Sequence, residues 1–350
     1  MHRVIVLSHQ SSTGSLLRSV GAAAKWQLFV NSSWADLRQQ VWTAQTARTT
    51  ESAAAVVLDL ATVALAGLTI ERALGEIKSL APDAPVALIA SGALHLDAVD
   101  ERWASTAGAA LLVPALSALR WERSGARLQA FINGSAESVD SDSQKRVLPY
   151  VLAAQRLERN NDALVNLAAV ENSGVDLPQL ARRIGRSGGV EIKNRTYHLR
   201  SYPQCFLAKD GIDWIAKALG IDQKAAITVG CALQATGLIY HVAREQLFSE
   251  EFLFFRVATT PSNFVLADHV SACRSKTGFE RRDRDYLGTS YPRCFVGSEA
   301  AASMQSRGMS FNEAMSVGER MLRLSIFSHV LDEHPFRDAK LFYRFGDERA

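Results

Sequence analysis

The sequence has few of the residues that build metal centres or disulfide frameworks. Only four of its 350 residues are cysteines, and no two of them form a CxxC pair, so neither a zinc ribbon nor a disulfide scaffold is indicated. Long apolar runs are also missing. The most apolar stretch, residues 53–70, contains an aspartate and two threonines, which fits a strand, a loop and a helix start better than a membrane span. The first residues lack the apolar core and cleavage site of a secretory signal. We therefore expect a cytoplasmic protein.

Neither positive nor negative charge predominates in the sequence. The formal net charge is +3, with 21% charged and 47% hydrophobic residues, which is ordinary for a globular protein and too weak to indicate nucleic-acid binding. The loop after the first apolar run contains a single glycine, Gly14, so no nucleotide-binding loop is indicated and we expect no cofactor. A chain of this length predicts two or three domains.

Residues 1–132 alternate between short apolar runs and helical patterns. The expected strands are 4–7, 27–30, 55–60, 86–90 and 109–113, and the expected helices are 16–24, 34–46, 68–80, 97–106 and 116–131. Runs that recur roughly every 25 residues have the spacing of βα units. The order predicts a doubly wound parallel sheet of the flavodoxin type, whose functional edge lies at the carboxyl ends of the strands.

Three segments of this region resemble a response-regulator receiver domain. They are VVLDL at 56–60, PVALIASG at 85–92 and GAALLVP at 108–114. In receivers the third strand ends in the phosphoacceptor aspartate, and Asp59 matches that position. The resemblance implies a receiver-like domain in which Asp59 is the phosphoacceptor candidate.

Other parts of the receiver pattern are replaced. In receivers an acidic pair after the first strand binds a divalent cation. A hydroxyl follows the fourth strand, and a lysine precedes the proline that follows the fifth strand. The corresponding residues here are Ser8, His9 and Gln10, then Ala90 or Ser91, then Val113. A pseudo-receiver that binds partners without phosphate is therefore expected.

Residues 133–146, NGSAESVDSDSQKR, contain two apolar side chains and predict a polar linker. A connecting segment, 147–176, follows with a helical pattern up to about residue 169, interrupted by Asn160 and Asn161. Two interpretations are open. The helix either docks on a neighbouring domain or forms a short coiled coil that makes a homodimer.

The second half of the chain repeats itself. Residues 195–206, RTYHLRSYPQCF, return at 284–295 as RDYLGTSYPRCF, and after a one-residue shift LFFR at 253–256 returns as LFYR at 341–344. The intervening matches pair Gly230 with Gly318, His241 with His329 and Phe248 with Phe336. Two copies of one fold explain this similarity.

The first copy predicts two helices and a hairpin. The helices are 210–219 and 223–235, with Asp222 as the N-cap of the second and Gly237 as its left-handed end. The strands are 238–242 and 252–257. Helices followed by a β-hairpin are typical of a winged helix.

Both copies resemble the DEP domain, a winged-helix-like module of signalling proteins, over residues 177–258 and 267–347. The resemblance is carried by an arginine and an aromatic residue, a Cys-Phe step into a helix with a tryptophan, a His-Val strand and a last strand rich in phenylalanine and tyrosine. The first copy has Trp214 and the second has Ser303 in its place. The resemblance implies a non-enzymatic signal-transduction adaptor that docks partner proteins and, as some DEP domains do, anionic membrane surfaces.

A basic cluster marks the first copy. Its members lie within 19 residues and are opposed by Glu191 alone: Arg182, Arg183, Arg186, Lys193, Arg195 and Arg200. Arg195 recurs as Arg284, which favours a structural role for that pair. The other five are candidates for binding a partner or an anionic surface, where each basic residue contributes about 1 kcal/mol. A solvated face without a ligand is the alternative.

A DNA-binding regulator is the alternative function, because a receiver-like domain joined to a winged helix is also the plan of many transcription factors. Base and phosphate contacts need arginine or lysine. The segment 225–236 has neither, and the second copy offers Arg320 and Arg323. Nucleic acid is therefore not the expected partner. His241 and His329 recur beside apolar residues, which suits structural histidines better than catalysis.

Overall fold

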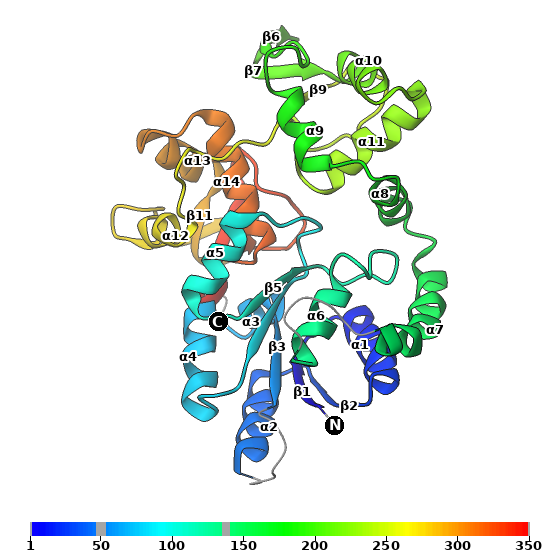
Figure 1. Cartoon of the computed structure of the whole chain (residues 1–350). Helices are drawn as coiled ribbons and strands as arrows, with labels where there is room; N and C mark the ends of the chain where they lie inside the picture. The colour runs from blue at the N-terminus through cyan, green and yellow to red at the C-terminus, as the bar shows by residue number, and fades with distance from the viewer. Residues whose placement is uncertain (1, 47–53, 135–140, 349–350) are drawn as a thin grey trace.

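The computed structural model describes residues 2–46, 54–134 and 141–348. These form an N-terminal α/β domain, two connecting helices and two α+β modules (Figure 1). The first module lies at the top of Figure 1, the second beside the N-terminal domain, and the connecting helices run between the N-terminal domain and the first module. Within the described residues, no helix combines the length and apolarity needed to cross a bilayer.

The N-terminal domain is a five-stranded parallel sheet with the order β2-β1-β3-β4-β5. The strands are β1 (His2–Leu7), β2 (Trp26–Asn31), β3 (Ala55–Asp59), β4 (Val86–Ala90) and β5 (Leu111–Pro114). The helices are α1 (Ser11–Ala23), α2 (Trp34–Thr46), α3 (Leu60–Leu65), α4 (Ile70–Leu80), α5 (Ala98–Ala107) and α6 (Gly125–Ile132). This is the flavodoxin-like strand order, so the predicted fold class is confirmed.

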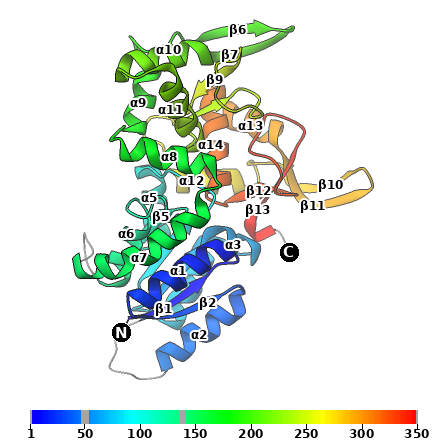
Figure 2. The same ribbon diagram turned by 90° about the vertical axis from the view of Figure 1, so that its right-hand side faces the viewer.

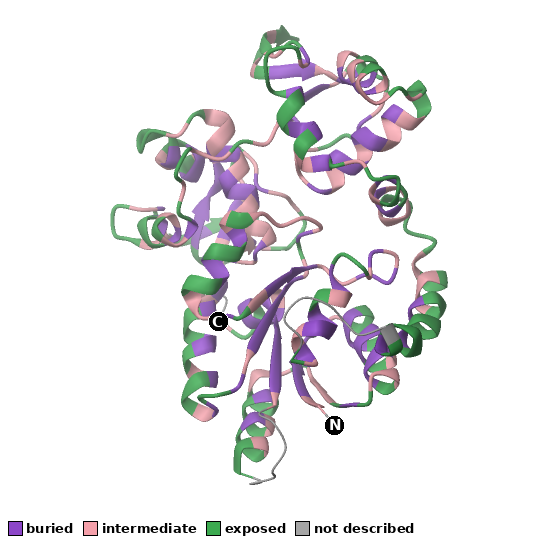
Figure 3. Cartoon of the chain, in the orientation of Figure 1, coloured by how far each residue is buried: buried purple, intermediate pink, exposed green. Residues whose placement is uncertain are grey.

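Both faces of this sheet are covered, as its sequence pattern requires. Alternate residues of a strand point to opposite faces: Val4 and Val6 pack with α1 and α6 residues, whereas Ile5 and Leu7 pack in a cluster that includes α2 and α4. The central strands β3 and β4 are buried along their whole length, whereas the edge strand β2 is buried only at Trp26 (Figure 3). The near-continuous apolar runs of the sequence are the consequence.

Two local predictions for this domain are wrong. The predicted helix 116–131 is reduced to α6, and α3 forms directly after β3, where the strand had been expected to include Leu60. The segment before α6 is held by Glu158, whose carboxylate accepts hydrogen bonds from the Ser117 hydroxyl at 2.6 Å and from the Ala118 N–H at 2.9 Å. A long-range acceptor thus replaces the first turns of the expected helix.

The connecting segment consists of α7 (Ser141–Glu158) and α8 (Asp162–Asn172). The predicted linker 133–146 is therefore too long, since α7 begins inside it; residues 135–140 lie outside the described residues. Val147 and Val151 are buried in the core that contains α1, so the helix docks on a neighbour. Leu148 and Leu152 remain exposed, and the homodimer stays a prediction.

The two modules have the same sheet. The first contains α9 (Leu177–Ile184), β6 (Lys193–Tyr197), β7 (Arg200–Leu207), α10 (Ala208–Leu219), α11 (Gln223–Ala235), β8 (Ile239–His241) and β9 (Phe254–Val257). The second contains α12 (Leu266–Arg274), β10 (Arg282–Tyr286), β11 (Thr289–Val296), α13 (Gly297–Ser306), α14 (Phe311–Arg323), β12 (Phe327–His329) and β13 (Phe342–Phe345), followed by η1 (Gly346–Glu348). Their orders are β6-β7-β9-β8 and β10-β11-β13-β12. The helices α10 and α11 and the closing hairpin were expected; α9 and the β6–β7 and β10–β11 hairpins were not.

Matched residues of the two copies have matched surroundings. The Tyr202 and Phe254 rings lie 5.4 Å apart, and the Tyr291 and Phe342 rings 5.6 Å apart. The predicted structural arginine has equivalent acidic neighbours in both modules: Arg195 with Asp210 at 3.6 Å and Arg284 with Glu299 at 2.5 Å. The repeat is therefore a repeat of structure.

The recurring histidines also have one environment. Nδ1 of His241 accepts from the Glu245 N–H at 3.3 Å, and Nδ1 of His329 accepts from the Glu333 N–H at 3.4 Å. Both side chains lie in mostly buried positions. Burial lowers the pKa of each imidazole below its ordinary value, which keeps Nδ1 free to accept and fits the expected structural role.

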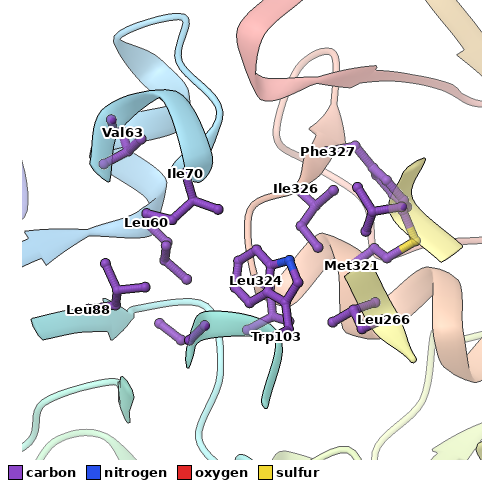
Figure 4. Packing of buried hydrophobic residues seen from close by; sticks show 14 of the residues in the cluster. Leu60, Val63, Ile70, Leu88, Trp103, Leu266, Met321, Leu324, Ile326 and Phe327 are labelled. Atoms are coloured by element: carbon purple, nitrogen blue, oxygen red, sulfur yellow. The ribbon is translucent and has the colours of Figure 1, made fainter. Parts of the chain in front are cut away.

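The second module shares one hydrophobic core with the N-terminal domain (Figure 4). Leu60, Val63, Ile70, Leu88 and Trp103 contribute from the N-terminal domain, and Leu266, Met321, Leu324, Ile326 and Phe327 from the second module. The main core of the first module is a second cluster, which includes Leu167 of α8; Tyr240 of β8 nevertheless packs in the shared core, and Leu94 of the N-terminal domain packs against the second cluster. The second module is thus the one fused to the sheet domain.

Candidate functional site

Asp59 ends β3 at the carboxyl edge of the sheet and is completely buried. Its Oδ2 accepts from the Thr62 hydroxyl at 2.6 Å, and its Oδ1 accepts from the Ser91 hydroxyl at 2.5 Å. Nδ1 of His9 lies 3.7 Å from Oδ2. Ser91, and not Ala90, therefore supplies the hydroxyl after the fourth strand.

The Asp59 pocket has the hydroxyl of the receiver pattern but not its cation site. Among residues 2–46, 54–134 and 141–348, no three His, Cys, Asp or Glu side chains are grouped so that they could hold a metal ion. Both carboxylate oxygens already have hydroxyl donors, so the chemistry shown here is that of a satisfied buried carboxylate. Whether Asp59 accepts phosphate stays a prediction.

The loop that contacts Asp59 also contacts the second module. A Cβ on Gly92, which follows Ser91, would lie 2.7 Å from the carbonyl oxygen of Arg323, so only glycine allows this approach. On α3, the Cβ of Ala64 lies 2.8 Å from the place of a Cβ on Gly346. The edge of the sheet that was expected to be functional is therefore in direct contact with the second module.

Arg320 of α14 joins the second module to α5. Its guanidinium donates to both oxygens of Asp97, at 2.8 and 2.7 Å, and to Oδ1 of Asp100 at 2.6 Å. Burial raises the pKa of Asp100, whereas Arg320 outweighs burial at Asp97 and lowers the pKa of that carboxyl. A cation between two carboxylates thus fixes the angle of α14 on the sheet domain.

The two modules contact each other through a buried ionic group. Glu319 lies 3.3 Å from both Arg244 of the first module and Arg323 of the second. Burial alone would raise the pKa of Glu319, but the two guanidinium groups lower it below its ordinary value. Arg323 also donates to the Thr236 carbonyl at 3.0 Å, and Arg337 donates to the Arg244 carbonyl at 3.1 Å. The modules therefore pack on each other.

These contacts bear on the DNA-binding alternative. Arg320 and Arg323 were the arginines available for DNA in the second copy, and both have carboxylate partners inside the molecule. The sequence marked them as a basic pair on a helix, but nothing in it indicated Asp97, Asp100 or Arg244 as partners. These contacts join segments more than 70 residues apart, and the sequence carries no signal for them.

The five candidate residues of the basic cluster do not form one surface. Arg182 and Arg186 line a cavity between the domains, and Arg183 lines a hollow beside Trp214 that Arg186 also borders. Lys193 pairs with Glu191 at 2.8 Å on β6, and Arg200 starts β7. The Arg183 guanidinium lies 5.4 Å from the centre of the Trp214 ring, a cation–π distance.

Each module also ends its first hairpin in an exposed leucine. Leu199 is 102% exposed and Leu287 is 87% exposed. Both leucines have positive φ angles, 61° and 49°, as do the other central residues of the two turns, His198 and Gly288. Such turns favour Asn-Gly, and a left-handed leucine costs about 1 kcal/mol. Fold stability therefore does not explain the leucines.

The two hairpins extend to the same side of the molecule. In Figure 2 both β6–β7 and β10–β11 project to the right, away from the body formed by the sheet domain and the connecting helices. Tyr197 at the first tip contacts the exposed Phe252 with ring centres 5.4 Å apart. The two hairpin tips that carry these exposed apolar residues thus lie on one side of the molecule, which makes the hairpins candidate docking elements.

Comparisons with known proteins agree with the repeat. The family model described as the domain found in Dishevelled, Egl-10 and Pleckstrin (DEP) matches residues 189–257 and 278–345. Among solved structures, full-length FixJ from B. japonicum is similar with a TM-score of 0.28 and 14% identity, over 67% of this chain and 89% of that chain.

Curated relatives match between 31% and 48% of the chain. The phosphatidylinositol 3,4,5-trisphosphate-dependent Rac exchanger 1 protein of Mus musculus is 26% identical over 44% of this chain and 10% of its own length. The Rac exchanger 2 protein of Homo sapiens is 26% identical over 48% and 11%, and the vacuolar membrane-associated protein iml1 of Schizosaccharomyces pombe is 29% identical over 31% and 7%. The matches thus span about a tenth of these relatives. The chain contains two DEP domains in tandem, behind an α/β domain with the flavodoxin-like strand order.

Proposed function

We propose that this chain is a non-enzymatic signal-transduction adaptor of the cytoplasm that docks reversibly on an anionic membrane surface through its two DEP hairpins. The observation that carries the proposal is the pair of exposed leucines, Leu199 and Leu287, held in left-handed backbone at equivalent tips. Residues kept in an unfavourable conformation at an exposed position call for a role outside folding.

The charges near the first tip support an anionic surface. Arg200 follows Leu199, and Lys193 lies on the paired strand. Arg183 and Arg186 line the hollow beside Trp214, together with Lys217. Basic residues attract anionic headgroups, and apolar tips then enter the interface. The names of the relatives support the same surface: two are called phosphatidylinositol 3,4,5-trisphosphate-dependent, and one is called vacuolar membrane-associated.

Partner proteins are expected on the remaining surface. An adaptor links two components, and the exposed apolar residues of α7, Leu148 and Leu152, lie outside the DEP domains. A second copy of the chain or a signalling protein could cover them. Affinity capture with the full chain bound to vesicles, compared with the full chain alone, would identify partners that depend on docking.

Co-sedimentation with vesicles tests the docking. The full chain is compared with Leu199→Asn and Leu287→Asn, singly and together, on vesicles with and without phosphatidylserine. Burying one leucine contributes at least about 1.5 kcal/mol, so each substitution should weaken binding to anionic vesicles about tenfold. Asparagine tolerates positive φ, so the variants should remain folded.

The control is Leu157→Gln, which removes another exposed leucine, 84% exposed, from α7. It should bind vesicles as the wild type does. Equal binding to neutral and anionic vesicles, or no loss in the double hairpin variant, would refute membrane docking through the tips.

A further inference from the structure

A cavity lies where the receiver-like domain and the two DEP domains meet. Its volume is about 490 Å³, within the range of small-molecule sites. The loop after β4 and the start of α5 form one wall, α9 and the segments around β8 and β9 a second, and α14 the third. A ligand in this cavity would contact all three domains.

Positive charge is in excess around the cavity. Five arginines and three carboxylates line it: Arg182, Arg186, Arg244, Arg320 and Arg323, with Asp97, Asp100 and Glu319. All three carboxylates already form ion pairs: Arg320 pairs with both aspartates, and Glu319 pairs with both Arg244 and Arg323. Two positive charges therefore remain without a counterion in the cavity lining.

The unpaired charge is located in the first DEP domain. Arg182 and Arg186 are exposed at the rim, and neither side chain has an ion pair in the described part of the chain. Arg244 is different: its side chain is 8% exposed, and its Nε is buried without an acceptor. Four other arginines have a buried guanidinium N–H without an acceptor, namely Arg120, Arg195, Arg337 and Arg344. Among the described residues, Arg244 is the one such arginine that lines the cavity, where a ligand oxygen can supply the acceptor.

We propose that this cavity binds a small phosphate-bearing dianion, held chiefly by Arg182, Arg186 and Arg244. Guanidinium groups match phosphate oxygens in two-pronged hydrogen bonds. A dianion would neutralise the excess charge, and its oxygens would supply the acceptor that Nε of Arg244 lacks. The Arg244 guanidinium lies 4.2 Å from the centre of the Tyr240 ring in the lining, so one face of that ring is not open to a ligand.

Binding here would strengthen the arrangement of the domains. Arg182, Arg186 and Arg244 belong to the first DEP domain, whereas Arg320 and Arg323 belong to the second. An anion that contacts both groups binds the packed arrangement better than a separated one, and it shifts the population accordingly. The site would thus couple the binding of a phosphate group to the orientation of the hairpins.

Isothermal titration calorimetry of the full chain with pyrophosphate tests the site, with sodium chloride at matched ionic strength as the reference. We expect saturable binding with one site per chain. Arg182→Gln and Arg186→Gln should each weaken it about tenfold, the loss of one charge-assisted hydrogen-bonding pair. The matched control is Lys193→Gln with Arg200→Gln, which removes two charges from the hairpin and should leave the affinity unchanged.

A second arm distinguishes a free phosphate from a lipid headgroup. Vesicles that contain phosphatidylinositol phosphate are offered to the wild type, to Arg182→Gln, which lines the cavity but not the hollow beside Trp214, and to Leu199→Asn/Leu287→Asn. Loss of vesicle binding in the arginine variant would assign the site to a headgroup; loss in the leucine variant alone would assign it to a soluble phosphate. Absence of saturable pyrophosphate binding, or equal weakening in the Lys193 and Arg200 control, would overturn the proposal while leaving membrane docking untouched.

Discussion

Arg320 offers a direct test of how the second DEP domain is held on the receiver-like domain. Arg320→Ala removes the hydrogen bonds to both oxygens of Asp97 and to Asp100, and one to the Thr260 hydroxyl at 3.3 Å. Asp100, whose side chain is 6% exposed, is then left without its cation. Removal of one partner from a buried pair costs about 3–5 kcal/mol. The side chain of Asp97 is 42% exposed, so water screens its interaction with Arg320. We therefore expect Arg320→Ala to lower the free energy of unfolding by about 3 kcal/mol, the lower end of that range.

Urea unfolding followed by tryptophan fluorescence measures this cost. Trp103 is buried in the core shared by the two domains, so it reports their separation. The unfolding midpoint of Arg320→Ala should fall without a change in slope. A surface control is Arg282→Ala, whose pair with Glu280 is 61% and 62% exposed; it should cost less than about 1 kcal/mol.

The effect of pH and a double-mutant cycle separate the charge from the packing. Without Arg320, the pKa of the buried Asp100 should rise further above its unfolded value, so the folded variant takes up a proton more readily. The loss of stability should therefore shrink as pH falls through that raised pKa. In an Asp100→Asn background the cost of Arg320→Ala should drop by at least about 1 kcal/mol. A cost that is equal in both backgrounds, or below about 1 kcal/mol in the wild type, would refute the clamp.

Three further predictions use single sites. Gly318→Ala places a Cβ 2.2 Å from the Phe336 ring and should lower the free energy of unfolding by about 1–3 kcal/mol. Gly75→Ala, with open space around its Cβ on α4, should instead raise the free energy of unfolding by up to about 1 kcal/mol. Urea titrations in which the two variants rank in the opposite order would contradict the packing described for Gly318. Burial lowers the pKa of His269 from 6.5 to about 4. The contribution of the neutral imidazole to the free energy of unfolding should therefore be fully present above about pH 6.5 and should be lost, by up to about 3 kcal/mol, as the pH falls towards 4. A His269→Asn variant that loses as much stability in acid as the wild type would exclude this histidine as the cause. Incubation with acetyl phosphate and magnesium should leave the intact mass unchanged, because Asp59 lacks a paired acidic cluster; a phosphoryl adduct that is absent from Asp59→Asn would show the opposite.

The sequence predicted the elements that have a strong internal pattern. The five parallel strands carry near-continuous apolar runs, and α11 carries its own start and stop signals: the Asp222 carboxylate accepts from the Ala225 N–H at 2.7 Å, and Gly237 has a φ of 74°. The hairpins were missed because β6 reads KNRTY and is exposed at four of five positions. A strand held mainly by edge pairing has no hydrophobic alternation for a pattern to reveal.

The candidate site was harder to predict, because neighbours in sequence separate in space. The cluster from Arg182 to Arg200 looked like one basic face, but α9 turns Arg182 towards the cavity while β7 carries Arg200 out to the hairpin. The groups that complete the site, Arg244 and Glu319, come from two domains and meet at 3.3 Å. Their pairing depends on how the domains pack, which no local pattern records.

The unequal strength of the interfaces indicates where regulation acts. The second DEP domain shares a continuous apolar core with the sheet domain, and separating them exposes side chains whose burial contributes roughly 1.5–3 kcal/mol each. A ligand can shift an equilibrium only by its difference in affinity for the two states, and such a core exceeds what one small anion supplies. The first DEP domain has its main core to itself and meets the second mostly through polar contacts, which are the ionic group around Glu319 and the hydrogen bonds of Asn312 to Tyr240 and to the Val257 carbonyl. Movement between the two DEP domains is therefore the step that an anion in the cavity can control.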